Sequence, residues 1–361
     1  MVALCAARSS SAAGGLPARL SDEEFWRLTV ELSEPPGTFL FENYVSNEIT
    51  YQRVIPELTQ TVTPGKAYLG VGPEQNFTYI AAVRPAIAFI VDIRRQNLLE
   101  HLLYKAIFEI ASDRADFVSR LFSRRRPWRL KGDAPVEELM GRFDKGSFPS
   151  LHMYRQTLRE VKTRLVGVHR FPLTGEDERG LATVLKAFKD GGPAINYSFD
   201  SRAPRPNANH TYVALMTASD GAGRQWSYLA SEENFRRVQD LQRRNLVVPV
   251  VGNFAGAKAI QAVGAYLKAH GVTVGAFYAS NVEEYIRKPL GNYSRFCSSV
   301  ASLPIEWSST FIRWTSGTAP RSFLNSIAEF TEAFTEGRVL PFEIRAANRR
   351  VLARISCNET Q

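Results

Sequence analysis

The chain has 361 residues, of which 44% are hydrophobic and 22% are charged. This composition excludes an intrinsically disordered protein and supplies the apolar side chains for one large domain or two small ones. The formal net charge of +9 is compatible with an anionic partner, such as nucleic acid, lipid or a small anion, or with basic side chains spread over a solvated surface.

Residues 1–19 lack the pattern of a folded element. They are interpreted either as the disordered N-terminus of a cytoplasmic protein or as the remnant of a truncated signal peptide of an exported one, so the sequence leaves the localisation open. A single domain is predicted over residues 20–345, followed by a tail at 346–361. No apolar run approaches the roughly 20 residues that a helix needs to span a bilayer.

The first predicted helix begins at Ser21, an N-cap candidate with Glu24 three residues later, and ends at Pro35. A second helix is predicted from residue 46 or 47 to residue 58. The polar residues around its start precede the first strand and are placed to fold over a site there: Asn43, Ser46, Asn47 and Glu48.

The clearest pattern lies between residues 67 and 110. A short strand at 67–69 enters the glycine turn 70–73, and a helix follows from 74 to 83. The apolar run 86–91 predicts a strand covered on both faces, as in a parallel sheet. Apolar residues at spacings of three and four then predict an amphipathic helix over 98–110. This order begins a βαβ unit and predicts an α/β fold.

Residues from about 114 to 192 show mainly helical spacing and are interpreted as a helical insertion. Two short strands are predicted after it, at 195–198 and 211–216. A second βαβ unit then consists of a strand at 246–251, a helix at 256–270 and a strand at 272–278. Pro249 argues against a central position for the first of these strands, because it lacks a backbone donor.

The glycine turn has the chemistry of a nucleotide-cofactor site. Gly70 and Gly72 lack a Cβ, so the backbone can approach a ligand closely. The helix that follows directs its free N–H groups at the same place. Asp92, which lies twenty residues after Gly72, is placed to accept hydrogen bonds from ribose hydroxyls, or alternatively to cap the next helix.

These residues resemble motif I and the second-strand acidic position of class I S-adenosylmethionine-dependent methyltransferases. The resemblance implies a Rossmann-like, methyltransferase-type fold with a mostly parallel sheet flanked by helices. It departs from the family pattern where Glu74 replaces the third glycine and Tyr68 replaces an acidic residue. By this resemblance, S-adenosylmethionine would be bound by a set of six residues: Gly70, Gly72, Glu74, Asn76, Asp92 and Asn253.

A closer resemblance covers most of the chain from about Leu20 to Trp314. The segments 68–80, 92–97 and 277–283 look like those of an uncharacterised bacterial family related to these enzymes, which brings no assigned reaction with it. NAD is the nearest alternative cofactor. A dinucleotide fingerprint, however, requires glycine where Gln75 stands.

Ligands of open α/β sheets bind outside the carboxyl ends of the strands, where Tyr278, Asn281 and Glu283 are also expected. Tyr278 and Glu283 are candidate proton acceptors, with Asn281 orienting them. Asn281 and Glu283 fit equally well as a helix cap and a first-turn acid. The three cysteines, Cys5, Cys297 and Cys357, and the five scattered histidines show no metal-ligand spacing, so no metal is expected.

Three functions follow from these observations. The first is an S-adenosylmethionine-dependent methyltransferase that acts on a small molecule or a protein. The second is a non-catalytic binding protein that keeps the methyltransferase fold. The third is a basic nucleic-acid-binding module, which rests on the net charge and on the run Arg124–Lys131, predicted to be an exposed loop. The missing alternation of aromatic and basic residues argues against the third. The oligomeric state is not predicted.

Overall fold

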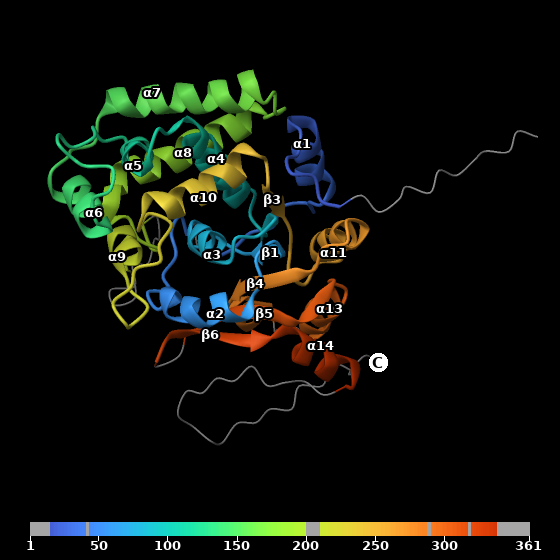
Figure 1. Ribbon diagram of the computed structural model, residues 1–361. Helices are drawn as coiled ribbons and strands as arrows, with labels where there is room; N and C mark the ends of the chain where they lie inside the picture. The colour runs from blue at the N-terminus through green and yellow to red at the C-terminus, as the bar shows by residue number, and fades with distance from the viewer. Residues whose placement is uncertain (1–14, 41–42, 200–209, 287–289, 317–318, 338–361) are drawn as a thin grey trace, which may run out of the picture.

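The computed structural model describes residues 15–40, 43–199, 210–286, 290–316 and 319–337 (Figure 1). Of the predicted N-terminal segment it describes only residues 15–19, and the predicted tail at 346–361 lies outside the described residues. Within the described ranges, no helix has the length and apolar character needed to cross a membrane.

A six-stranded sheet forms the centre of the molecule, in the order β3-β2-β1-β4-β5-β6. All neighbouring strands are parallel except β5 and β6, which pair antiparallel. The structure therefore confirms an α/β fold with a mostly parallel sheet. The strands are β1 (Ala67–Gly70), β2 (Ile87–Asp92), β3 (Val247–Val251), β4 (Val274–Ser280), β5 (Ile305–Thr315) and β6 (Arg321–Ser326).

Helices cover both faces of the sheet (Figure 1). The connections from β1 to β2 and from β2 to β3 run towards one edge, and those from β3 to β4 and from β4 to β5 run towards the other. Because parallel crossovers are right-handed, the two sets of helices lie on opposite faces. One face carries α3 (Gln75–Val83), α4 (Arg95–Ile110) and α10 (Glu232–Arg243), and the other carries α11 (Ala259–Ala269) and α13 (Leu290–Ala301), next to which α14 (Ile327–Thr335) packs.

The chain between α4 and α10 builds a further helical layer. It contains α5 (Arg114–Leu121), α6 (Val136–Lys145), α7 (Leu151–Lys162), the π-helical turn η2 (Thr163–Val168), α8 (Gly175–Gly191), the 3₁₀ turn η3 (Gly192–Ala194) and α9 (Tyr212–Thr217). Since α8 and α10 both pack on α4, that helix is buried around most of its circumference. The helix predicted over 98–110 is therefore confirmed, but its polar side chains are buried as well as its apolar ones.

Two other predicted elements differ from the structure. The strand predicted at 211–216 is wrong: Tyr212–Thr217 form the helix α9, because the Thr211 hydroxyl caps the helix at the Ala214 N–H and its apolar residues share one buried face. Residues 195–198 form no strand, and only Asn196 bridges to Thr211.

The second predicted helix starts later than expected. Residues 51–54 form the 3₁₀ turn η1 (Tyr51–Val54), and α2 follows (Ile55–Thr61). The polar groups of residues 46–48 bind Glu74 and Gln75, directly after the glycine turn, instead of continuing a helix.

Two local predictions are confirmed. The helix α1 (Asp22–Glu31) begins with a capping box, in which Ser21 and Glu24 each accept the other's backbone N–H. Pro249 lies in β3, which is the edge strand of the sheet, where its missing donor costs no hydrogen bond to a second neighbour. The short helix α12 (Val282–Ile286) follows β4.

Candidate functional site

The carboxyl ends of β3, β2, β1 and β4 lie along one edge of the sheet, and the chain after α1 runs across them in that order. Glu34 accepts backbone N–H groups after β3, and the Gly37 N–H donates to the Ile93 carbonyl after β2. The Ser46 N–H donates to Glu74 after β1. Glu48 then reaches β4. The segments 34–40 and 43–50 therefore cover the edge where ligands of such sheets bind.

Asn76 fills the inside of the glycine turn. Its amide nitrogen donates to the carbonyls of Val71 (2.9 Å), Gly72 (3.2 Å) and Pro73 (2.7 Å). Its amide oxygen accepts the Tyr68 hydroxyl at 2.8 Å. A Cβ on Gly70 would overlap this oxygen, so Gly70 is needed to make room for Asn76. Gly72 has a positive φ of 75°, and a Cβ on it would meet no atom within 4 Å.

This difference predicts unequal costs for two alanine substitutions. Gly70→Ala should lower the free energy of unfolding by about 3 kcal/mol, because the new methyl group overlaps a packed, hydrogen-bonded amide. Gly72→Ala should cost only about 1 kcal/mol, the backbone strain of its positive φ. Urea unfolding of the two variants measures both values. Equal costs, or a larger cost at Gly72, would contradict this account of Gly70.

Asp92 is engaged by its own neighbour at the end of β2. Its carboxylate accepts the Arg94 backbone N–H at 2.9 Å and two guanidinium N–H groups at 3.0 Å each. Both side chains are almost fully buried. Asp92 does not cap α4, whose N-cap residue is Arg94. A ribose at this position would therefore compete with an existing, charge-assisted pair.

Glu48 lies where the direction of the crossovers reverses, between β1 and β4. It accepts hydrogen bonds from the Tyr278 hydroxyl (2.8 Å) and the Ser280 hydroxyl of β4, and from the Gln75 amide (3.0 Å) of α3. It is 2% exposed, and burial raises its pKa despite these three donors. Glu48 thus joins the two halves of the sheet at the position where doubly wound folds bind ligands.

Glu74 and Glu100 add two more buried carboxyl groups beside the glycine turn. Both side chains are fully buried, and burial raises the pKa of Glu74 to about 8 and that of Glu100 well above its usual range. Charge repulsion from Glu48 further raises the pKa of Glu74, and charge repulsion from Glu74 and Asp92 further raises that of Glu100. One oxygen of each carboxyl has no hydrogen-bond partner among the described residues.

The polar atoms around these carboxyls come from one face of α4. Asn97, Glu100, His101 and Tyr104 follow one another at the three- and four-residue spacing of a helix face. Within the described chain, the Asn97 amide nitrogen, the His101 Nδ1 and the Tyr104 hydroxyl are also buried without a partner. A group of polar atoms left without partners is unusual in a protein interior. This face of α4 is therefore a candidate surface for contact with a polar ligand.

His101 connects this face to the glycine turn. Its Nε2 lies 2.9 Å from the Gly72 carbonyl, which can only accept, so Nε2 carries the proton. Burial lowers the pKa of His101 to about 4, and the ring is therefore neutral at physiological pH, with a lone pair on Nδ1. The unpartnered atoms of the site are thus acceptors on Glu74, Glu100 and His101 and donors on Asn97 and Tyr104.

Comparison with known proteins gives a family and no activity. A family described as a domain of unknown function (DUF7790) matches residues 43–171 and 143–334, which together span most of the chain. The chain belongs to this family. The matched region includes Glu48, Glu74, Glu100 and Tyr278, whereas Glu34 precedes it. No curated protein matches the sequence.

The buried carboxyls Glu48, Glu74 and Glu100 are called the acidic cluster below. The other predicted site residues of this DUF7790 chain lie away from it. Asn253 follows the edge strand β3, where its N–H donates to Glu34 and its side chain accepts the Ala255 N–H. Asn281 donates to Glu284. Glu283 is buried against β5, where Arg313 donates to it at 3.1 Å. Of the three candidate catalytic residues, only Tyr278 is brought to the glycine turn, through Glu48.

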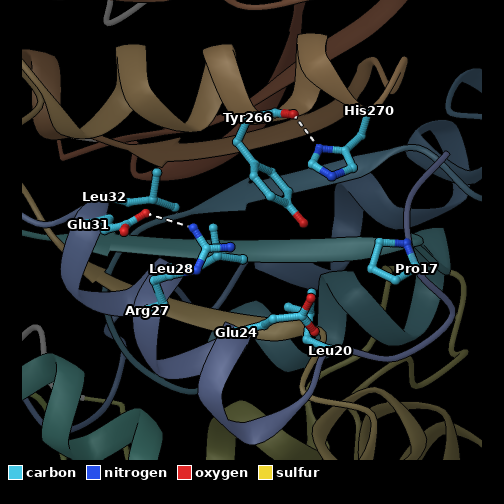
Figure 2. A pocket seen from close by; sticks show the side chains of 9 residues that line it. All are labelled: Pro17, Leu20, Glu24, Arg27, Leu28, Glu31, Leu32, Tyr266 and His270. Atoms are coloured by element: carbon cyan, nitrogen blue, oxygen red, sulfur yellow. Dashed lines mark hydrogen bonds and ion pairs between the residues drawn. The ribbon is translucent and has the colours of Figure 1, made fainter. Parts of the chain in front are cut away.

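A separate surface cavity of about 330 Å³ lies between α1 and α11 (Figure 2). Figure 2 shows Arg27 paired with Glu31, and His270 donating to the Tyr266 carbonyl at 2.8 Å. The cavity lining includes no residue of the acidic cluster. In the described part of the DUF7790 chain, no group of three or more His, Cys, Asp or Glu side chains is arranged to hold a metal ion.

Proposed function

We propose that this DUF7790 chain is a methyltransferase-like protein that binds S-adenosylmethionine at the carboxyl edge between β1 and β4, with an acceptor still to be identified. The observation that carries the proposal is the pair of buried carboxyls, Glu74 and Glu100, each with an unpartnered oxygen beside the glycine turn. Their position places two carboxyl groups, whose pKa values burial raises, beside a nucleotide-type turn, and a bound cation would favour their ionisation.

The sheet supports this location. The strand order β3-β2-β1-β4-β5-β6 is an order of doubly wound folds, in which the crossovers reverse between β1 and β4. Nucleotide ligands of such folds bind at the carboxyl ends of the strands next to this reversal. The glycine turn, Asp92 and Glu48 all lie there.

The unpartnered carboxyl oxygens of Glu74 and Glu100 favour a cationic ligand. Burying a carboxylate without a partner is costly, so such groups in a native protein are normally paired or protonated. S-adenosylmethionine carries a positive sulfonium and an ammonium group, which would supply the missing charge and the missing donors. When bound, it supplies a methyl group on a positively charged sulfur. Glu48, held by Tyr278 and Ser280 and with a raised pKa, is suited to take a proton from an acceptor.

Titration calorimetry of the full chain tests the proposal. We expect S-adenosylmethionine to bind, and Glu74→Gln to weaken binding at least about tenfold, because the variant loses a carboxyl group that can ionise beside the cationic ligand. Asp92→Ala should weaken S-adenosylmethionine and S-adenosylhomocysteine alike, since both carry the ribose. Glu57→Gln, which removes an exposed carboxylate of α2, is the matched control and should bind as the parent does.

A folded protein that gives no heat and no thermal shift with either ligand would overturn the proposal. That outcome would favour the second candidate, a non-catalytic protein that keeps this fold. Its support is that several ligand-binding groups are already engaged within the chain: Asn76 fills the turn, Arg94 pairs with Asp92, and Glu48 occupies the reversal point.

A further inference from the structure

The basic run that precedes α6 lies beside the loop between α6 and α7. Arg124 forms a bridge with Pro149, and the Ser150 N–H donates to the Ser123 carbonyl at 2.8 Å. The Arg124 guanidinium points inward and donates to the Phe143 carbonyl at 2.8 Å. Two segments that are separate in the sequence therefore form one surface on the helical layer, remote from the sheet (Figure 1).

Three large hydrophobic side chains project from this surface. Trp128 is 78% exposed, Phe148 is 86% exposed and Leu151 is 56% exposed. Trp128 and Phe148 each stand next to a proline, which limits the freedom of the loop that carries them. Exposed hydrophobic residues that gather in this way, unlike single ones, indicate an interaction site.

The charges within the two segments that carry them are all of one sign. Residues 124–132 contain five Lys or Arg, residues 145–159 contain three, and neither segment contains Asp or Glu. Arg155 and Arg159 are exposed one and two turns after Leu151 on the same side of α7. The Arg129 guanidinium lies 4.0 Å from the centre of the Trp128 ring, and Arg126 also contacts Asp113. Acidic residues flank the two segments at Asp133, Asp144 and Glu160.

We infer that this surface, defined by Trp128, Phe148, Leu151 and the basic residues of 125–131 and 145–159, docks the protein on an anionic phospholipid bilayer. Interfacial binding needs apolar side chains that enter the headgroup layer and a basic rim that contacts anionic lipid, and both are present. Nucleic-acid binding fits less well, because bases stack on aromatic rings within a groove, whereas these side chains project from the surface.

Sedimentation of the full chain with lipid vesicles tests the inference. The protein should bind vesicles of equal parts phosphatidylserine and phosphatidylcholine much more strongly than vesicles of phosphatidylcholine alone, and added salt should weaken the binding. Replacing Arg125, Arg129 and Lys131 with Gln should weaken it about a hundredfold, at about fivefold for each basic side chain. Trp128→Ser with Phe148→Ser should weaken it at least about tenfold.

The control variants carry the same kinds of substitution elsewhere. Trp307→Ser removes a tryptophan that is 84% exposed at the start of β5, and Arg53→Gln with Lys268→Gln removes two exposed cations. Both should bind as the parent does. Equal binding to the two vesicle types, or loss in the controls equal to that in the test variants, overturns the inference. The inference is also overturned if the protein binds a single-stranded polyuridine probe but no vesicles, and the test variants abolish the polyuridine binding. The surface would then bind nucleic acid.

Discussion

Replacing Glu74 with Gln should raise the free energy of unfolding at alkaline pH by about 5 kcal/mol relative to the parent protein. Burial raises the pKa of Glu74 in the folded protein from its ordinary 4.5 to about 8. Its contribution to stability is therefore fully present below the unfolded-state pKa and is lost as the pH rises through the folded-state pKa. Gln cannot ionise, so the variant avoids this loss.

Urea unfolding at several pH values between about 6 and 9 measures the effect. The parent should lose stability across this range more steeply than Glu74→Gln does. Glu48 and Glu100 are present in both proteins, so the difference between the two curves isolates Glu74. Glu57→Gln should follow the parent, because its carboxylate is exposed. Parallel curves for parent and Glu74→Gln would show that Glu74 is not held protonated in the fold.

Lys105→Met should lower the free energy of unfolding by about 3 kcal/mol at neutral pH. Lys105 is buried on α4, where its ammonium donates to Glu109 at 2.7 Å and to the Gln242 carbonyl and the Asn245 side chain at 2.5 Å each. Removing it leaves the buried Glu109 short of one cation. The cost lies at the lower end for a broken buried pair, because Glu109 keeps other partners, His169 and Arg164.

The pH dependence distinguishes this charge effect from lost packing. Burial alone would raise the pKa of Glu109, but the hydrogen bond from His169 and the charge of Lys105 outweigh it and lower the pKa. The stabilisation is therefore present above the ordinary pKa of 4.5 and is lost as the pH falls through the folded-state value. The cost of Lys105→Met should thus shrink as the pH falls below this ordinary pKa. A cost that stays constant with pH would contradict the charge effect. Lys268→Met, which replaces an exposed lysine, serves as the control.

The sequence predicted those parts of the fold that local patterns determine. The apolar run before Asp92 is a buried strand because it is covered on both faces, and the periodic helices around β3 and β4 lie close to their expected positions. Ser21 caps its helix as its spacing to Glu24 indicates. The position of the carboxyl edge could be predicted from the parallel strands alone.

The site depended on contacts that local patterns do not contain. Glycine spacing suggested room for a ligand at Gly70, but Asn76, six residues later, uses that space. The polar face of α4 has the spacing of a solvated surface, and only the helices packed around it show that Glu100 and His101 are buried. The available sequence signal is that these polar residues recur at helical spacing directly after Asp92, the acidic residue at the end of β2.

The covering segments 34–40 and 43–50 also constrain how the chain folds. Glu34 binds the Lys258 N–H across 224 positions of sequence, and Glu48 binds Tyr278 across 230. These contacts require strands that are synthesised long after the segments themselves, and closing such long loops is slow. On the ribosome, the beginning of the chain must therefore wait until β4 has emerged. We expect nascent chains that end before β4 to expose the carboxyl edge and to be more vulnerable to proteases and aggregation than the finished protein.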